Sequence, residues 1–350
     1  MSDGSTSSGS PPSWVELALT RCKPCTIRVA AAVSLSWRRD SHRAVRRVQR
    51  DLSLGLEPVP VAVENAHDSW ASPFPSDSVY HPTCDGVDER MRRRLRGAAA
   101  AGCECGECCA SGTCGCLDLS SAAAYDRDGR LDWLRAGEAE PSRHTVVIEC
   151  SDACACAVTC RNRVVGRGVR VPLVVFRTRD RGWGLRTRDG LRRGQFVCEY
   201  AGQLLDAEEA ARRRRGPAAP EREREGDGDV GCNYLMSVRE HVGEGASARI
   251  LATHIDPSAR GNVGRYINHS CEPNLATQVV RAGSLVPRLA FFAACDLRAG
   301  SELTFSYGQA GSVGREPICE RTSQTQRDGR RRCRCGAPCC AGWLPFDLCV

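Results

Sequence analysis

A short segment in the last third of the chain places an amide, an imidazole and a thiol almost side by side. Asn268 and His269 are adjacent, Cys271 follows, and Pro273 comes too soon after them for a helix. Three such side chains crowded into a non-helical turn indicate a binding site rather than plain surface. Further along, residues 302–308 (ELTFSYG) have the pattern of a short strand that ends in a tyrosine and a glycine.

Cysteines are the second chemical signal, with 23 in 350 residues. The N-terminal residues 1–13 are rich in Ser and Gly and show no secretory signal, so metal binding is favoured over a disulfide framework. Zinc takes four tetrahedral ligands, and short Cys-x-Cys steps let consecutive thiolates face neighbouring ions. Three spaced groups fit this chemistry: Cys103, Cys105, Cys109, Cys114 and Cys116; then Cys150, Cys154, Cys156 and Cys160; and finally Cys333, Cys335 and Cys340.

The number of thiolates constrains the zinc sites. The nine cysteines of the first two groups cannot fill three separate four-ligand sites, but they close a triangular three-zinc cluster if three sulfurs each bridge two ions. The third group leaves a tetrahedral ion one ligand short. Adjacent cysteines leave two choices open, Cys108 or Cys109 and Cys339 or Cys340. We expect structural zinc, because all-thiolate sites have no open position for a substrate.

Composition bears on partners and compartment. The formal net charge is +7, but thirteen zinc-bound thiolates with four Zn²⁺ would reduce it to about +2, so DNA contact is only weakly supported. Lys23 is the single lysine among the 49 basic residues, which we attribute to coding bias. No apolar run approaches the length of roughly 18 residues that a membrane span needs, so no membrane partner is expected. The oligomeric state is not indicated.

These motifs resemble those of SET-domain histone-lysine methyltransferases of the Su(var)3-9 class. Besides the two segments above, the resemblance rests on residues 182–186 (GWGLR), 196–202, 233–234 and 238–241, and it covers roughly residues 51–347. It implies a mainly β fold, the SET β-clip, with several short sheets around a knot-like core and few helices. It also implies a pre-SET module with the nine-cysteine, three-zinc cluster and a post-SET module with a single zinc whose fourth ligand is Cys271.

The expected organisation follows from this resemblance and from the local pattern. We predict a disordered Arg-rich tail over 1–50, a pre-SET domain over 51–164, a SET domain over 165–308, a linker over 309–328 and a post-SET module over 329–350. A disordered insertion is expected at about 212–231, after a helix capped by Asp206 and Glu209. Strands are predicted at Val169–Thr178, Gln195–Leu205, Tyr234–Arg239, Arg249–Ile255, Thr277–Arg281, Leu289–Ala294 and Glu302–Tyr307.

The resemblance also assigns catalytic roles. The family transfers a methyl group from S-adenosylmethionine to a lysine amine. Tyr307 corresponds to the active-site tyrosine, and Tyr234 to a second tyrosine where the cofactor and lysine channels meet. Phe305 occupies the position that separates product states, and phenylalanine there favours di- or trimethylation. Ser306 replaces an aspartate common in the family, which removes a charge beside Tyr307.

Cofactor contacts are implied for two segments. Asn268 and His269 correspond to residues that bind S-adenosylmethionine, and a further loop corresponds to Arg181, Gly182, Trp183 and Gly184. Glycine in such a loop allows close approach of the backbone. Arg265 either contacts the cofactor or braces the motif, and the sequence does not decide between the two.

The sequence therefore predicts a histone-lysine methyltransferase that acts in the nucleus on chromatin. Its expected partner is the histone H3 tail or the nucleosome, with the ninth residue of H3 favoured and the thirty-sixth open. Two alternatives stay open: a weakly active or inactive zinc-stabilised scaffold that binds chromatin, and a methyltransferase for a non-histone protein.

Overall fold

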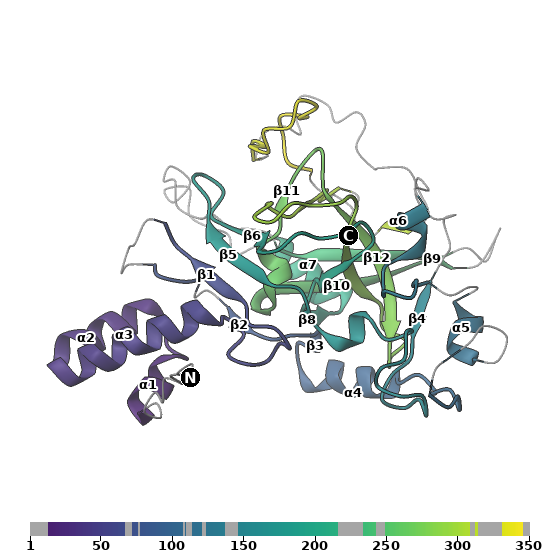
Figure 1. Ribbon diagram of the computed structural model, residues 1–350, viewed down its shortest axis with the longest axis horizontal. Helices are drawn as coiled ribbons and strands as arrows, with labels where there is room; N and C mark the ends of the chain where they lie inside the picture. The colour runs from purple at the N-terminus through teal and green to yellow at the C-terminus, as the bar shows by residue number, and fades with distance from the viewer. Residues whose placement is uncertain are drawn as a thin grey trace, which may run out of the picture.

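Short strands make up most of the regular structure. The computed structural model describes residues 13–66, 72–75, 78–107, 109, 114–120, 124–136, 146–215, 234–242, 249–308, 312–313 and 331–345. Within these ranges the strands form four sheets, and helices lie mainly at the N-terminus and on the periphery (Figure 1). The mainly β fold class predicted from the sequence is confirmed. The described helices include none that is both long enough and apolar enough to cross a membrane.

One small sheet carries the loop that the sequence assigns to the cofactor. It has the order β1 (Ala62–Glu64), β5 (Leu173–Arg177) and β6 (Trp183–Thr187), with β1 parallel and β6 antiparallel to β5. The β5–β6 turn contains Gly182, whose φ of 68° lies in the left-handed region that glycine adopts without strain. The carbonyl of Gly182 accepts a hydrogen bond from the backbone N–H of Thr178 at 2.9 Å, which closes the hairpin.

The largest sheet lies beside this hairpin. Its main path is β15 (Ser312–Val313), β9 (Met236–Val242), β10 (Arg249–Gly261), β8 (Gly202–Leu205) and β3 (Asp85–Gly86), and β2 (Val79–Tyr80) pairs with β10. Strands β2 and β3 come from the N-terminal part of the chain, and β15 from the C-terminal part, so this sheet joins segments far apart in sequence.

Two further sheets complete the core. A four-stranded sheet has the order β4 (Val147–Glu149), β12 (Leu275–Ala282), β13 (Arg288–Ala293) and β7 (Phe196–Glu199). The central strand β13 supplies the fully buried Phe291 and Phe292. A two-stranded parallel sheet pairs β11 (Asn268–His269) with β14 (Thr304–Phe305). The 3-10 helices η1 (Val165–Arg167) and η4 (Val263–Tyr266) precede β5 and β11 respectively.

The N-terminal region differs from the sequence prediction. A disordered tail over 1–50 is wrong for residues 13–50, which form α1 (Trp14–Leu19), α2 (Pro24–Val33) and α3 (Leu35–Arg50). Apolar residues at helical spacing, among them Ile27 in α2 and Val45 and Val48 in α3, join the same buried cluster as the SET strands. The high arginine content concealed this pattern, because it lowers the mean hydropathy of α3 without interrupting its buried face. Figure 1 shows α2 and α3 side by side, projecting beyond β1.

Other elements follow the prediction closely. Each predicted strand range overlaps an observed strand, and the range Gln195–Leu205 holds both β7 and β8. Strands β9 and β10 extend beyond their predicted ends, to Val242 and Gly261, and β14 is limited to Thr304–Phe305. Strand β6 was not predicted, because a Gly-Trp-Gly sequence has the pattern of a loop. Helix α7 (Ala207–Arg215) begins after Asp206, whose Oδ1 accepts the backbone N–H of Glu209 at 2.9 Å. The carboxylate of Glu209 instead pairs with Arg212 and Arg213, so the reciprocal half of the capping box is replaced by ion pairs.

The peripheral helices belong to the pre-SET part: α4 (Glu89–Gly97), α5 (Gly115–Leu119) and α6 (Asp132–Ala136). Several predicted segments lie partly outside the described residues. Of the predicted insertion, residues 216–231 are outside, and of the predicted linker, only residues 312–313 are described. Post-SET residues 331–345 are described.

The packing of the N-terminal helices gives a stability prediction. Ile27→Ala should lower the free energy of unfolding by about 2–4 kcal/mol, because Ile27 is fully buried and its loss leaves a cavity. The matched control is Val29→Ala, two residues along the same helix but 70% exposed, which should change stability by no more than about 0.5 kcal/mol. Chemical denaturation of the two variants checks this, and equal effects would contradict the packed helix.

Candidate active site and zinc sites

The two signature segments meet in the β11–β14 pair. In this parallel pair Asn268 lies opposite Thr304, and His269 opposite Phe305. The side chain of Asn274 fixes the turn that follows: its Nδ2 donates to the carbonyl of Glu302 at 2.7 Å, and its Oδ1 accepts the N–H of Thr304 at 2.9 Å. Residues about thirty positions apart in sequence are thus held in one register.

A carboxylate that the sequence reasoning did not single out connects this pair to the cofactor loop. Glu302 accepts a hydrogen bond from the Nδ2 of Asn268 at 3.0 Å and from the guanidinium of Arg181 at 2.7 Å. Asn268 also donates to the carbonyl of Trp183 at 3.4 Å. The signal available in the sequence was an acidic residue at the start of the second signature segment. The predicted cofactor residues Arg181, Trp183 and Asn268 therefore lie together around the half-buried carboxylate of Glu302.

Aromatic rings build the wall next to β14. The ring of Phe305 lies 4.8 Å from that of Phe291 and 4.8 Å from that of Tyr307, measured between centroids. Phe305 is 2% exposed, whereas Tyr307 is 37% exposed and reaches the surface of the site. The hydroxyl of Tyr307 donates to the backbone carbonyl of Ile267 at 3.1 Å. A phenol and a carbonyl oxygen are thereby placed together at the exposed edge of an apolar wall.

His269 is positioned by contacts on both ring nitrogens. Its Nδ1 accepts the backbone N–H of Tyr307 at 3.2 Å, and its Nε2 lies 3.4 Å from the Sγ of Cys271. Burial lowers the pKa of the imidazole below its ordinary value, so the neutral ring is favoured. A neutral ring held in this way links Tyr307 to the cysteine and has no proton-transfer role that the geometry supports.

The side chains of Tyr234 and Arg265 contact each other. The guanidinium of Arg265 lies 4.5 Å from the centre of the Tyr234 ring, a cation–π distance. Its Nη1 donates to the Oγ of Ser78 at 2.6 Å. The hydroxyl of Tyr200 donates to the carbonyl of Tyr234 at 2.5 Å. Of the two roles left open for Arg265, this geometry supports bracing, because the side chain is buried against Tyr234.

The pre-SET cysteines gather in one cluster. Their Sγ atoms form three overlapping sets of four, each within 4.8 Å, and Cys103, Cys109 and Cys150 each belong to more than one set. The Sγ of Cys109 lies 3.6 Å from that of Cys103 and 3.4 Å from that of Cys150. Cys108 lies outside the described residues. The sets are Cys103, Cys105, Cys109 and Cys114; Cys103, Cys109, Cys150 and Cys156; and Cys103, Cys116, Cys150 and Cys154, while Cys160 is buried in the same cluster.

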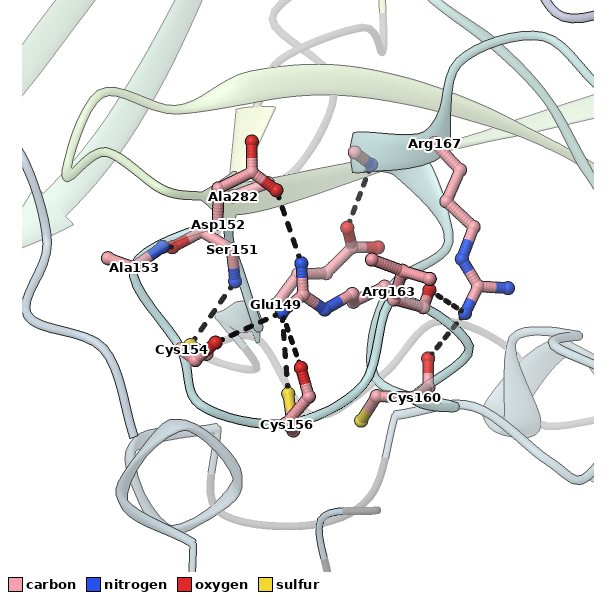
Figure 2. Close-up of polar contacts among 12 residues, drawn as sticks. Glu149, Ser151, Asp152, Ala153, Cys154, Cys156, Cys160, Arg163, Arg167 and Ala282 are labelled. Carbon is pink, nitrogen blue, oxygen red and sulfur yellow. Dashed lines mark hydrogen bonds and ion pairs between the residues drawn. The ribbon is translucent and has the colours of Figure 1, made fainter. Parts of the chain in front are cut away.

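Donors surround these sulfurs in a way that suits thiolates. Figure 2 shows Arg163, whose Nη2 lies 3.5 Å from the Sγ of Cys156 and also donates to the carbonyls of Cys154 and Cys156. The Sγ of Cys154 accepts the backbone N–H of Cys103 and that of Ser151, both at 3.3 Å. Hydrogen bonds to sulfur and a nearby cation stabilise the negative charge that metal-bound thiolates carry.

A buried carboxylate joins the cysteine cluster to the SET domain. Glu149 (labelled in Figure 2), at the end of β4, accepts several hydrogen bonds. Its donors are the backbone N–H groups of Val164, Val165 and Gly166 at 2.7–3.1 Å and the hydroxyl of Tyr125 at 2.7 Å. Burial raises the pKa of this carboxyl, although the four donors act in the opposite direction. The 3-10 helix η1 is thus fixed to the strand that leads into the second cysteine group.

The post-SET cysteines close onto the signature motif. Cys271, Cys333, Cys335 and Cys340 have their Sγ atoms within 4.8 Å of one another. The thiol of the neighbouring Cys339 is exposed and instead contacts the carbonyl of Cys271 at 3.7 Å, so the geometry selects Cys340.

Several contacts prepare this group for a metal. The pKa of Cys335 is lowered to about 6, since backbone hydrogen bonds at Cys271 and Ala337 outweigh the opposing effect of burial. The backbone N–H of Ala341 donates to the Sγ of Cys271 at 3.4 Å. Arg334 also donates to the carbonyl of Asp180 at 3.5 Å, which brings the post-SET segment against the cofactor loop.

Comparison with known proteins assigns the family. The SET domain matches residues 182–308, and the Pre-SET motif matches residues 53–163. The chain is 37% identical over 312 residues to the histone-lysine N-methyltransferase SETMAR of Mus musculus, covering 85% of this chain and 90% of that protein. It belongs to the SET-domain protein-lysine methyltransferases.

Solved structures agree with this assignment. The crystal structure of the methyltransferase domain of human SETMAR has a TM-score of 0.65 at 34% identity, and the alignment covers 85% of this chain and 98% of that one. The structure of KRYPTONITE in complex with mCHH DNA, an H3(1–15) peptide and SAH has a TM-score of 0.61 at 27% identity, covering 85% of this chain and 54% of that one. The resemblance to SET-domain methyltransferases that the sequence indicated is therefore confirmed, and it extends to SETMAR in particular.

The Glu302 contacts generate a prediction for activity. Glu302→Ala should reduce kcat/KM about tenfold or more, because Arg181 and Asn268 both lose a charge-assisted acceptor. Glu302→Gln keeps an oxygen acceptor without the charge and should lie between the wild type and the alanine variant. Steady-state methyl transfer to a lysine peptide measures both, and an alanine variant as active as the wild type would contradict the role of this carboxylate.

Proposed function

We propose that the protein transfers methyl groups from S-adenosylmethionine to a lysine of the histone H3 tail. The observation that carries the proposal is the placement of the Tyr307 hydroxyl beside the carbonyl of Ile267, at the exposed edge of the aromatic wall and next to Asn268 and His269. The names of the relatives, which are histone-lysine N-methyltransferases, and the H3 peptide and SAH in the KRYPTONITE structure support it.

The chemistry requires a neutral lysine amine. At its reference pKa of about 10.4, a lysine is almost wholly protonated at pH 7, and deprotonating it costs roughly 4.6 kcal/mol. Apolar walls such as Phe305 and Phe291 disfavour the ammonium and lower this cost. The Tyr307 hydroxyl and the Ile267 carbonyl then orient the neutral amine for in-line attack, and no strong base is required if the proton leaves through water.

The residues fit the cofactor. At Gly182 no atom lies within 4 Å of the position that a Cβ would occupy, so the backbone of the 181–184 loop is open to a ligand on that side. We assign Arg181, Gly182, Trp183, Gly184, Asn268, His269 and Tyr234 to this site, with Arg265 acting through Tyr234. When bound, S-adenosylmethionine supplies a methyl group activated by its positively charged sulfur. Gly184 is also needed for packing, because a Cβ there would lie 2.9 Å from the Cγ2 of Thr178.

The peptide is proposed to add as a strand to β9. This strand pairs with β10 along its whole length, whereas among the described residues its other edge pairs only at Arg239 and Glu240, with β15. The outer edge of residues 236–238 is therefore available to an extended tail, immediately after Tyr234. We infer the ninth residue of H3 as the favoured target, with the thirty-sixth second, and a nuclear, chromatin-bound protein.

Four zinc ions are proposed to hold the flanking modules. Cys103, Cys109 and Cys150 would be the bridging ligands of a three-zinc cluster, because these three recur among the overlapping sets. The fourth ion would be bound by Cys271, Cys333, Cys335 and Cys340. The all-thiolate donor sets and the hydrogen bonds to sulfur fit structural zinc.

The principal test combines a mutation with substrate mapping. Tyr307→Phe should lower methyl transfer by about a hundredfold or more, because it removes a positioned hydroxyl. Its melting temperature should change little, because Tyr307 is partly exposed. Methyl transfer is measured with labelled S-adenosylmethionine, on histone octamers and on a peptide array. Cofactor binding without any transfer by the wild type would favour the scaffold, and transfer to non-histone peptides alone would exclude the histone assignment.

The fourth zinc site has a matched control within the chain. Cys271→Ser should lose one zinc ion per chain and most of the activity, because the residue is shared between the signature turn and the metal. Cys339→Ser changes an adjacent but exposed thiol and should keep both. Metal analysis by mass spectrometry, combined with activity assays, decides the assignment, and a Cys339→Ser variant that lost zinc would overturn the choice of Cys340.

Product state provides a further test. The family pattern predicts di- or trimethylation, since Phe305 has no hydroxyl and leaves room beside the amine. Phe305→Tyr should shift the product towards monomethyl-lysine. Mass spectra of the peptide product distinguish the states, and a wild-type enzyme that produced only monomethyl-lysine would contradict the prediction.

A further inference from the structure

The N-terminal helices carry almost all of the chain's excess positive charge. Residues 13–50 contain nine basic and two acidic side chains, so their formal net charge of +7 equals that of the whole chain. The remaining residues are neutral in sum. With thirteen zinc-bound thiolates and four zinc ions, that remainder would fall to about −5, which makes the contrast between the two parts larger.

The basic side chains are solvent-exposed and have few carboxylate partners. Every lysine and arginine between residues 13 and 50 is exposed. Over the part of the chain that the structure describes, the only salt bridge that any of them forms joins Arg43 to Asp40, at 4.0 Å with the arginine side chain 54% exposed. Arginines elsewhere in the chain, such as Arg213 and Arg281, are paired with carboxylates at short distances.

Four of these arginines form a straight row on α3. Arg39, Arg43, Arg46 and Arg50 are spaced by four, three and four residues, which places them on one face of the helix, and we call them the α3 arginine row. The row spans about 16 Å along the helix axis. Duplex DNA carries one phosphate charge per about 1.7 Å of its axis when both strands are counted, so a length of duplex equal to the row carries about ten phosphates.

The opposite face of α3 is already occupied. Ala44, Val45 and Val48 are buried against the rest of the protein. An interfacial membrane helix must insert a continuous apolar face into the bilayer, whereas the exposed large apolar side chains of α3 are limited to Leu35 and Trp37 in its first turn. Arginine forks also match the geometry of phosphate oxygens. A nucleic-acid backbone is therefore favoured over a lipid surface.

We propose that the α3 arginine row binds the phosphate backbone of duplex DNA. Because the contacts go to phosphates, binding is independent of base sequence and weakens with salt. The inference rests on the proposed function in one respect: if the substrate is a histone tail, the row would hold the enzyme on the DNA beside that tail.

Salt-dependent binding to a short duplex DNA tests the row in the full-length chain. The variant Arg39→Gln, Arg43→Gln, Arg46→Gln and Arg50→Gln should reduce the slope of log affinity against log salt concentration by about 3 to 4, at about 0.9 per phosphate contact. A matched variant changes four exposed arginines on α4 by the same charge, Arg90→Gln, Arg93→Gln, Arg94→Gln and Arg96→Gln, and should keep most of the slope. Fluorescence anisotropy measures both.

A lysine variant and two other anionic ligands distinguish DNA binding from loss of folding and from binding to other anions. The same four α3 positions changed to lysine should retain the slope, which shows that charge and not loss of folding is responsible. Equal losses in the α3 and α4 variants, or none in either, would overturn the proposal. So would binding of the α3 row to phosphatidylserine vesicles or to polyglutamate with DNA binding unchanged.

Methylation of a free H3 peptide separates this inference from the proposed function. The α3 glutamine variant should methylate the peptide at the wild-type rate, because the peptide carries no DNA and the row is outside the active site. Should the wild-type chain fail to methylate the peptide, the proposed function fails while the DNA measurement still stands. A large loss on the peptide caused by the α3 variant would contradict a docking role.

Discussion

The parallel pairing of β11 with β14 is the constraint on which the rest of the site depends. Each strand contributes two residues, so the pair has little stability of its own and must be held by its surroundings. Asn274 and Glu302 provide this support, the first by bonding across the turn and the second by joining the pair to Arg181. The residues predicted to bind the cofactor, the aromatic wall and the post-SET cysteines are all positioned relative to this pair.

Shared residues couple the three modules. Glu149 joins the cysteine cluster to η1, which precedes the SET domain, and Cys271 joins the signature turn to the C-terminal cysteines. Both contacts involve groups that are costly to bury alone, a carboxylate and a set of thiols. Each module therefore supplies hydrogen-bond or metal-binding partners to polar groups of its neighbour. These shared contacts help short sheets and small helices to form an ordered structure.

Much of the site was predictable from the sequence, because its chemistry depends on residue types at short spacing. The cysteine groups, the signature segments and the strands around them carry local patterns, and the structure brings them together as expected. Contacts across long separations were not predictable. Glu302 and Ser78 have partners distant in sequence, and no spacing rule identifies them. The N-terminal helices were missed for a different reason: three buried apolar residues in each of α2 and α3 are a weak signal among many arginines.

The two-residue length of β11 restricts how the segment can vary. Side chains on a strand alternate between faces, so inserting or deleting one residue between Ile267 and Cys271 would exchange the faces of Asn268 and His269. The same shift would turn the Cys271 thiol away from its three partners. A single substitution leaves this alternation of faces unchanged, whereas a change of length does not. Insertions and deletions are therefore expected in the loops that connect helices and strands, and not within this segment.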